Sequence, residues 1–327
     1  KDEFLERLNK LGESGQWILG EEVSNFEKSF AEFVGTKYAV GVCCGTHAIM
    51  LALRALNIKG NVALPSHTFK ATCSAVLDAG AKPALYDMDG LFQNSWPKLD
   101  SFIQVHISGE IQNNGNVRLI KYNKFNIPII EDACQAIGAI KNPTSDAQCW
   151  SFYPAKILGA LGDAGAITTN REDIYDYVKE ARNHFKGTNQ DFGGNYRIDE
   201  LQACWLNIRL KHINEILAKR KEIAEIYLRE LRELEYQGFI KLPNNQEGRV
   251  WQDFIIDIGD KREELFSFLK ENGIETIKNN YDFPPEYPKL PKAAKYEAET
   301  LRIPCNENLT NEEMNFVIEK IKEFFKA

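Results

Sequence analysis

Short apolar runs alternate with segments of helical period over the chain up to about residue 200. Each run contains valine, isoleucine, threonine or an aromatic residue and ends near glycine, proline or a charged residue, as buried strands do. The runs lie at 38–42, 61–64, 83–86, 127–130, 149–152 and 166–169. Helical spacing follows the first run, with Ile49, Leu53 and Leu56, and follows the second through Thr72 to Leu77. This alternation predicts βαβ units with helices around a mostly parallel sheet.

The pattern changes after about residue 200. Residues 201–234 are nearly unbroken helical pattern with charged residues interleaved, which predicts one long helix or two joined ones. A strand at 254–258 and a helix at 263–271 suggest a smaller α+β unit. The capping-box sequence Thr310-Asn-Glu-Glu313 predicts the start of a last helix. Its apolar face would consist of Met314, Val317, Ile318 and Ile321.

The length agrees with two units. A chain of 327 residues is too long for one ordinary core and suits two domains, or one large α/β domain with an appendage. We therefore expect a large α/β domain with an N-terminal helix at 1–210 and a small C-terminal α+β domain at 211–327.

Charge and hydropathy exclude several classes of protein. The formal net charge is −7, which argues against binding to nucleic acid or to an anionic membrane surface. No stretch approaches the ~20 apolar residues of a membrane span, and the first residues lack the apolar region of a signal peptide. With 43% hydrophobic and 27% charged residues, the composition is that of a globular protein.

The seven cysteines are an odd number, and none of them has Cys-x-x-Cys spacing. Most lie in apolar runs, so we interpret them as small buried hydrophobic residues in a reducing compartment. The sequence thus predicts a cytoplasmic protein with no disulfide framework and no metal site.

Three segments could carry chemistry, and the first is the strand-to-helix turn Cys44-Gly45-Thr46. A glycine at such a turn leaves backbone N–H groups free at a helix start, which favours an anion such as phosphate. An ordinary βα turn explains the same residues. The segment is neither a Walker loop nor a Gly-x-Gly-x-x-Gly fingerprint.

The second segment is Asp132, which directly follows the expected strand at 127–130. Ligands of open α/β sheets lie at the carboxyl ends of strands, where a carboxylate can meet a cationic ring nitrogen or a metal. Alternatively, Asp132 caps a helix at 133–137 and touches no ligand.

The third segment surrounds Lys156, which lies between two apolar runs in a glycine-rich stretch whose other charge is Asp163. A partly desolvated lysine loses proton affinity and can form an imine and shuttle protons. The alternative is a solvated surface lysine. Pyridoxal phosphate requires an anion site for its phosphate, a carboxylate for its ring nitrogen and a partly desolvated lysine for its aldehyde. The three segments together offer these groups.

Through these three segments and the sequence around them, the chain resembles the DegT/DnrJ/StrS-type nucleotide-sugar aminotransferases, which are fold-type-I pyridoxal-phosphate enzymes. The resemblance runs from Trp17 to the C-terminal helix. Its motifs are Gly45-Thr-His-Ala-Ile-Met-Leu-Ala-Leu, Pro65-Ser-His-Thr-Phe-Lys-Ala-Thr72, Glu131-Asp-Ala-Cys-Gln-Ala136, Ser151-Phe-Tyr-Pro-Ala-Lys156 and Gly194-Asn-Tyr-Arg-Ile-Asp-Glu-Leu-Gln-Ala203, with weaker echoes at 105–109 and 301–304.

The resemblance implies a role for each matching residue toward the cofactor ring. Lys156 would hold pyridoxal phosphate as a Schiff base. Asp132 would pair with the pyridine nitrogen, Gln135 would lie against the phenolic oxygen, and Phe69 would stack on the ring.

It also implies how the phosphate is held. Backbone N–H groups of Gly45 and Thr46 and the hydroxyl of Ser151 would bind it. Asn195 would reach the phosphate of the neighbouring subunit's cofactor, which implies a homodimer with shared active sites.

Several positions depart from the family pattern. Cys44 stands where serine or asparagine is usual, His47 where aspartate or alanine is commoner, and Ala155 replaces the usual threonine before the lysine. The segments around 89–102 and 140–148 look abridged, and they would shape the rim of the active site.

The function implied is transfer of an amino group, from L-glutamate, to a nucleotide-linked keto-deoxy-sugar, with pyridoxamine phosphate as the intermediate form of the cofactor. Such a reaction serves amino-sugar, surface-polysaccharide or glycoside biosynthesis. Because the net charge is negative, a nucleotide diphosphate would need local cations. His184, Lys186 and Arg197 are candidates, and Tyr281 would face the sugar; each is otherwise a surface residue.

Two alternatives stay open. The pyridoxamine-phosphate-dependent sugar dehydratases of the same family resemble this chain but carry histidine where Lys156 stands. A non-catalytic sensor or regulator with this fold would be expected to have lost Lys156 or Asp132, and both are present. The missing dinucleotide fingerprint disfavours a nicotinamide oxidoreductase.

Overall fold

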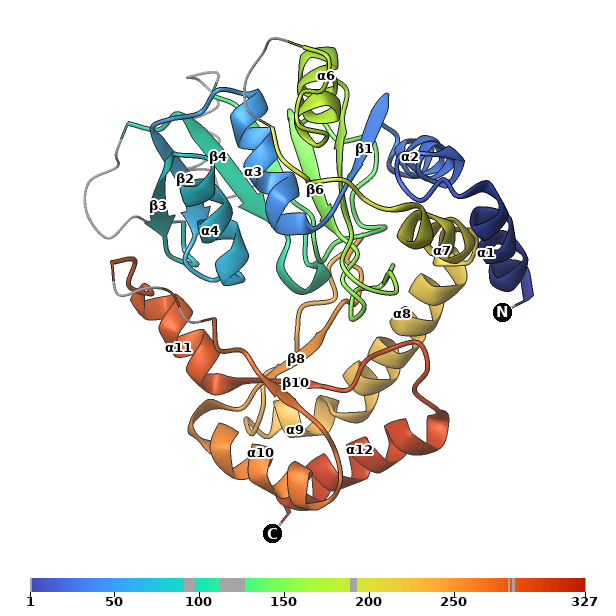
Figure 1. Cartoon of the computed structure of the whole chain (residues 1–327). Coiled ribbons are helices and arrows are strands. Elements are labelled where there is room, and N and C mark those ends of the chain that lie inside the picture. The colour runs from blue at the N-terminus through green and yellow to red at the C-terminus, as the bar shows by residue number, and fades with distance from the viewer. Residues whose placement is uncertain are drawn as a thin grey trace.

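The computed structural model describes residues 2–90, 98–111, 127–188, 193–281, 283 and 286–326. The described residues form a seven-stranded sheet and a three-stranded sheet. In Figure 1 the large sheet and its helices lie in the upper half, and the small sheet and further helices lie in the lower half. None of the described helices is both long enough and apolar enough to cross a lipid bilayer.

The large sheet is mostly parallel, as predicted. Its strands are β1 (Tyr38–Val42), β2 (Asn61–Pro65), β3 (Lys82–Tyr86), β4 (Ser101–Val105), β5 (Ile129–Asp132), β6 (Ala147–Ser151) and β7 (Gly165–Thr169). Their order is β1-β7-β6-β5-β4-β2-β3. Only β7 runs antiparallel to its neighbours, β1 and β6. The five strands from β6 to β3 therefore deliver their carboxyl ends to one edge.

The sheet departs from the sequence prediction at two strands. β4 was not predicted, because Ser101 and Gln104 interrupt its apolar run, although all five of its residues are buried. The strand expected at 127–130 lies at Ile129–Asp132. Proline has no N–H for the strand ladder, and the Pro128 carbonyl accepts bonds from Ser101 and from the backbone N–H of Phe102.

Helices cover both faces of the large sheet, because alternate residues of each strand point to opposite sides. One core combines Val40, Cys149 and Ile167 of the sheet with α3 (Gly45–Ala55), α4 (Lys70–Asp78) and α6 (Glu172–Ala181). The other combines Ala39, Trp150 and Ala166 with α2 (Glu21–Val34) and α7 (Glu200–Lys211).

The N-terminal helix α1 (Asp2–Ser14) packs beside α7, with the Phe4 and Trp205 rings 5.4 Å apart. Buried Glu200 accepts hydrogen bonds from the backbone N–H groups of Gly20, Glu22 and Val23. A carboxylate in α7 thus satisfies the free N–H groups at the start of α2.

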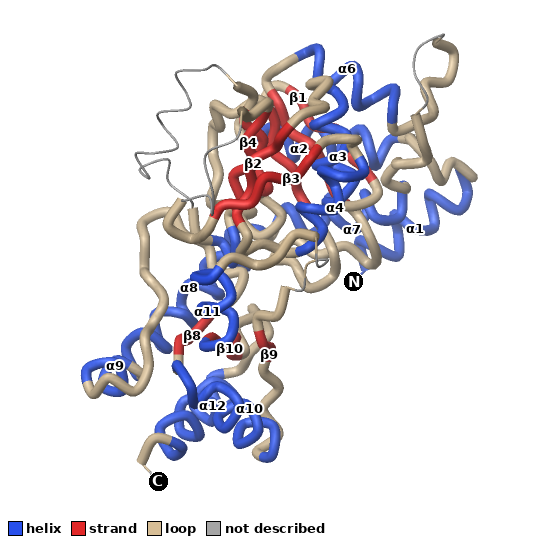
Figure 2. The backbone as a smooth tube through the Cα atoms, turned by 90° about the vertical axis from the view of Figure 1, so that its left-hand side faces the viewer, coloured by secondary structure: helices blue, strands red, loops and turns tan. Residues whose placement is uncertain are grey.

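The C-terminal part holds the small antiparallel sheet β8 (Phe254–Asp257), β10 (Thr300–Ile303) and β9 (Ile277–Lys278), in that order. Its helices are α8 (Ile213–Glu230), α9 (Arg232–Tyr236), α10 (Arg262–Glu271), α11 (Pro291–Glu299) and α12 (Asn311–Phe324), with short 3-10 turns at Gly259–Lys261 and, in the larger part, at Ile107–Gly109. In Figure 2 this part lies below the large sheet, with α10 and α12 side by side.

Two helical predictions can be checked here. The pattern at 201–234 forms three helices, α7, α8 and α9, instead of one or two, because the chain bends at His212 and Leu231. The capping box at Thr310 and Glu313 is confirmed, and the predicted apolar face of α12 is buried.

The helix α8 connects the two parts of the molecule. Near its start, Ile213 and Leu217 pack in the core shared with the large sheet. From Ile223 onward its apolar residues belong to a third core with the small sheet. The division of the chain into domains near residue 210 stays a prediction.

Replacing Phe30 by alanine should lower the free energy of unfolding by about 3–5 kcal/mol. The Phe30 ring is fully buried and lies 5.2 to 5.4 Å from Phe26, Trp150 and Phe152. Urea unfolding measures the change. Tyr236→Ala is the control, because that ring is 79% exposed and its loss should cost less than about 0.5 kcal/mol. Equal effects of both substitutions would contradict this description of the core.

Candidate active site

A pocket of about 960 Å³ lies at the carboxyl edge of the large sheet. The ends of β4, β5 and β6 and the start of α3 form one wall, and residues of β9, β10 and α12 form the other. The pocket thus lies where the two parts of the molecule meet, a common position for ligand sites.

The pocket brings together most of the residues that the sequence singled out. Seven of the eight predicted cofactor residues line it, as does Tyr281; the seven are Gly45, Thr46, Phe69, Asp132, Gln135, Ser151 and Lys156. These residues come from four separate segments of the chain, which only the fold brings together.

Asp132 is the last residue of β5, and its carboxylate is 6% exposed. One carboxylate oxygen, Oδ2, accepts a hydrogen bond from the Thr72 hydroxyl at 2.7 Å, and Thr72 pairs in turn with Thr68 at 2.8 Å. The other oxygen accepts from the backbone N–H of Cys134 at 3.2 Å. A carboxylate has about four acceptor sites, so capacity remains for a cationic ligand.

The alternative role of Asp132, as the cap of a helix at 133–137, is wrong. Residues 133–137 form turns and not a helix. The chain reverses there because Ala133 N–H bonds to Cys149 of the neighbouring strand and Ala136 N–H bonds to Ala133. Asp132 therefore faces the pocket for a reason other than helix capping.

The start of α3 forms the narrow end of the pocket. A Cβ atom added to Gly45 would lie 2.7 Å from Cys134 Sγ and 2.9 Å from Ser151 Cβ, so the helix backbone approaches β6 closely. The side chain of Cys44, the N-cap residue, makes no capping hydrogen bond. The first N–H groups of α3, beside the Ser151 hydroxyl, thus offer donors to an anion.

Lys156 lies in the loop between β6 and β7, and it is half-buried. Its backbone N–H donates to Tyr153 O at 2.8 Å. On either side, Gln252 bonds to Ala155 O at 3.0 Å and to Ile157 N–H at 3.2 Å. The backbone is thus fixed, whereas the Lys156 amine forms no hydrogen bond or ion pair with any described residue. Because Lys156 is half-buried in the pocket wall, the structure does not support the alternative of a solvated surface lysine.

Gln135, Phe69 and Tyr281 complete the wall. Gln135 Oε1 accepts from the backbone N–H of Ser108 at 2.6 Å, which orients the amide. The Phe69 ring is half exposed to the pocket and meets Tyr281 edge-on at 6.1 Å. Burial raises the pKa of Tyr281 to about 12, so its hydroxyl stays protonated, and it is hydrogen-bonded to Arg302.

Four predicted residues do not line the pocket: Asn195, His184, Lys186 and Arg197. They lie in the segment between α6 and α7, where Asn195 forms a bridge with Asn183. Arg197 donates to Asn183 Oδ1 at 2.7 Å. Asn195, His184 and Lys186 are exposed to solvent. Within one chain, therefore, none of them belongs to the pocket that contains Lys156 and Asp132.

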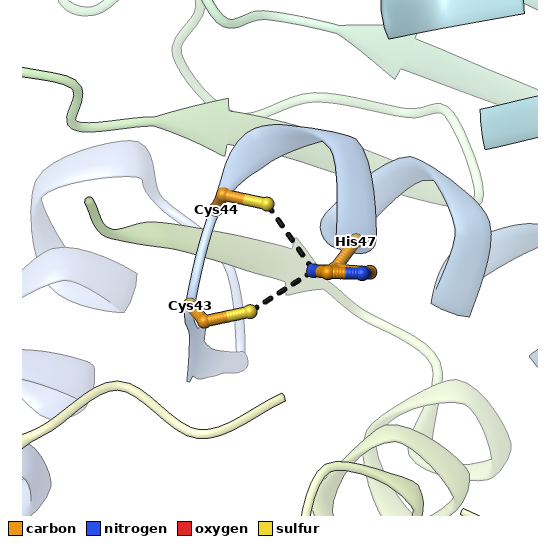
Figure 3. A group of neighbouring side chains, drawn as sticks. All are labelled: Cys43, Cys44 and His47. Carbon is orange, nitrogen blue, oxygen red and sulfur yellow. Dashed lines mark hydrogen bonds between the residues drawn. The ribbon is translucent and has the colours of Figure 1, made fainter. Parts of the chain in front are cut away.

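A cluster of two thiols and one imidazole borders the narrow end, at Cys43, Cys44 and His47 (Figure 3). A hydrogen bond from Cys43 is the largest cause that lowers the pKa of Cys44, to about 4, and His47 adds to the effect. The hydrogen bond between Cys44 and His47 is the largest cause that raises the pKa of His47. The pKa of Cys43 is raised, chiefly by its bond to Cys44.

The DegT/DnrJ/EryC1/StrS aminotransferase family matches residues 1–322. The chain belongs to this family. A dTDP-3-amino-3,6-dideoxy-alpha-D-galactopyranose transaminase of Aneurinibacillus thermoaerophilus is 34% identical in an alignment of 352 positions, gaps included, that covers 98% of this chain and 95% of that protein.

Solved structures of related enzymes agree with the fold. DesV of S. venezuelae, in complex with a ketimine intermediate, superimposes with a TM-score of 0.91 at 29% identity, covering 100% of this chain and 95% of that chain. NtdA of Bacillus subtilis, with bound cofactor PMP, gives 0.92 at 28% identity, covering 100% and 82%. The predicted family, aminotransferase fold and pyridoxal phosphate cofactor are confirmed.

The pocket of this family member suits that cofactor on its own geometry. It offers a buried carboxylate with free acceptor capacity at Asp132, N–H donors at Gly45 and Thr46, and at Lys156 an amine that has no partner among the described residues. These are the kinds of group that the ring nitrogen, the phosphate and the aldehyde of the cofactor require.

Sequence reasoning missed three residues that shape the site: Thr72, Gln252 and Arg302. Thr72 ends the quoted motif at 65–72, and Arg302 lies in the weaker echo at 301–304, so both segments had been singled out without a role for these side chains. Nothing in the sequence around Gln252 indicated a role in the site, because its hydrogen-bond partners flank Lys156, about a hundred residues earlier in the chain.

Replacing Thr72 by valine should destabilise the cofactor-free protein by about 2 kcal/mol, because the buried carboxylate of Asp132 loses one of its two hydrogen bonds. Thr72→Ser keeps the hydroxyl and should lose much less. The free energy of unfolding in urea measures both. A double-mutant cycle with Asp132→Asn should show coupling, and strictly additive effects would contradict the bond's importance.

Proposed function

We propose that this protein is a pyridoxal-phosphate-dependent aminotransferase that moves an amino group from L-glutamate to a nucleotide-linked keto-deoxy-sugar. The observation that carries the proposal is the meeting of Lys156 and Asp132 in one pocket, at the start of α3. The Asp132 carboxylate lies at the end of β5, and the Lys156 amine lies in the loop after β6. Binding of a ligand such as pyridoxal phosphate explains why both groups face one pocket.

Asp132, Gln135 and Phe69 would hold and orient the cofactor ring. When bound, pyridoxal phosphate supplies a ring that withdraws electrons from the reacting carbon. The Asp132 carboxylate would keep a proton on the ring nitrogen, which makes that withdrawal effective. Phe69 would fix the plane of the ring by stacking, worth about 1 kcal/mol beyond burial.

Gly45, Thr46 and Ser151 would bind the phosphate through two N–H groups and a hydroxyl. Their rigidity supports this role, since the α3 backbone packs directly on Ser151 and on Cys134. A fixed anion site sets the position of the whole cofactor relative to Lys156.

Lys156 would then act as the proton carrier. Its amine would take the proton from the α-carbon of the amino donor and return it to the cofactor side, and it would perform the reverse transfer when the sugar ketone is aminated. Gln252, which holds the backbone on both sides of Lys156, would keep the amine in reach.

The far part of the pocket carries cationic side chains that an anionic substrate would need. Arg220, Lys278 and Arg302 line it, and each is ion-paired in the structure, with Glu307, Glu263 and Asp253, so the substrate would have to compete for them. Tyr281 lies between this part and Phe69 and would face the sugar. The named activity of the Aneurinibacillus relative, a transaminase of a dTDP-linked sugar, supports the same class of substrate.

A homodimer with shared active sites belongs to the proposal. Asn195, His184 and Lys186 are exposed, so a second copy of the chain would find them free for contact. Arg197 would support that surface through Asn183. A cytoplasmic location is also part of the proposal. It is supported by the seven cysteines, which are all free thiols.

The reaction should proceed as two successive half-reactions. Adding L-glutamate to the cofactor-loaded protein should convert the bound cofactor to its amine form, seen as loss of the yellow absorbance. Nucleotide-linked keto-sugars should then restore the absorbance and yield an amino-sugar, identified by mass and NMR. Lys156→Ala should slow both steps by at least about 100-fold, because the proton carrier is gone. Lys59→Ala, at an exposed lysine, is the matched control.

Different failures point to different alternatives. A protein that binds the cofactor but responds to no amino donor would favour the sensor or regulator. A protein that removes water from the sugar without adding nitrogen would favour the dehydratase. Unchanged turnover of Lys156→Ala would remove this lysine from the mechanism.

A further inference from the structure

Two thiols and one imidazole meet at the turn between β1 and α3. Cys43 Sγ lies 3.0 Å and Cys44 Sγ 3.2 Å from the same atom, His47 Nδ1. Figure 3 shows both thiols directed toward the imidazole from neighbouring positions of the chain. The three ligand atoms lie within 4.8 Å of one another, and among the described residues no other group of metal-ligating side chains is this compact.

The cluster arises from local geometry that the sequence pattern conceals. Side chains of adjacent residues in a straight strand point to opposite sides, so a Cys-Cys pair is not an obvious ligand pair. Here the chain leaves β1 at Val42 and enters α3 at Gly45, so Cys43 and Cys44 lie in the turn itself. The first turn of α3 then places His47 against both of them.

The neighbouring structure holds these side chains in place. The backbone N–H of Cys43 donates to Tyr196 O at 2.8 Å. The Tyr196 ring lies 4.7 Å from the His47 ring. A Cβ atom on Gly165 would lie 2.5 Å from the Cys44 carbonyl carbon, so β7 supports the turn from below. Metal sites require ligands that are fixed in this way by their surroundings.

The chemistry of the ligands selects the metal. Two sulfur ligands and one imidazole suit Zn²⁺, whereas magnesium and calcium prefer oxygen. Three protein ligands leave the fourth position of a tetrahedral ion for water. The three residues are half-buried, and Cys44 also lines the pocket, which gives an ion a path of entry. Asp163, which lines the pocket too, adds negative charge close to Cys43.

We propose that Cys43, Cys44 and His47 form a binding site for Zn²⁺ at the edge of the cofactor pocket. This inference does not depend on the proposed transaminase activity, because only Cys44 of the three residues lines the pocket. It departs from the sequence prediction of no metal, which rested on the absence of Cys-x-x-Cys spacing.

Cobalt is the probe, because Co²⁺ takes the place of Zn²⁺ in tetrahedral sites and absorbs visible light. Cofactor-loaded protein, kept reduced, should bind one equivalent of Co²⁺. Its spectrum should show the intense red-region bands of a tetrahedral ion and thiolate-to-cobalt charge transfer. Adding one equivalent of Zn²⁺ should abolish both. Red-region bands are the main readout, since the cofactor does not absorb there.

Variants assign the ligands. Cys43→Ala, Cys44→Ala and His47→Ala should each weaken Co²⁺ binding by more than about 100-fold, because each removes a direct ligand. Cys134→Ala is the matched control, since it removes a half-buried pocket thiol outside the cluster and should leave the spectrum unchanged. Thermal unfolding of each variant verifies that it is folded.

Two results would overturn the proposal. The first is wild-type protein that shows no tetrahedral cobalt spectrum even when the Co²⁺ concentration is well above the protein concentration. The second is a spectrum that persists in folded Cys43→Ala and His47→Ala proteins, which would place the ion elsewhere. Neither result would affect the half-reactions with glutamate and keto-sugar, so the two proposals fail separately.

Discussion

The buried carboxylate of Asp132 is the constraint on which the site depends. Taking an ionised carboxylate out of water is costly unless hydrogen bonds replace the lost hydration. Thr72 from α4 and the N–H of Cys134 supply two such bonds, and Thr68 extends the network. The remaining acceptor capacity points toward the pocket. A charge that is only partly satisfied by the protein favours a cationic ligand over an empty site.

The topology explains why this carboxylate meets the other functional groups. Parallel strands end on one edge of the sheet, so Asp132 at the end of β5 lies opposite Cys149 of β6, two residues before Ser151, although the chain between the two strands leaves the sheet. The start of α3 packs against Ser151, and the loop after β6 carries Lys156. The C-terminal part closes the pocket from the other side, and Gln252 bonds directly to the backbone around Lys156.

The sequence predicted well what depends on local pattern or on family motifs. Lys156, Asp132 and the turn at Gly45 were recognised from their positions relative to apolar strands, and the structure gathers them in one pocket. β4 was missed because two polar residues interrupt its apolar run, although all five of its residues are buried.

Residues whose partners are distant in the chain gave no usable signal. Gln252 acts on a loop that precedes it by almost a hundred residues. The thiol cluster is local in sequence, but it gave no signal either, because it depends on the backbone course through Cys43 and Cys44. Asn195 and its neighbours lie outside the pocket of a single chain, so motif matching alone does not say what they contact.

The central claim is that Lys156 forms the covalent link to pyridoxal phosphate. Borohydride reduces a carbon–nitrogen double bond between a lysine and this cofactor to a stable amine, which survives proteolysis. After reduction of the loaded protein, peptide mass spectrometry should find the cofactor on the peptide that contains Lys156 and nowhere else. Cofactor attached to another lysine, or to none, would contradict the account.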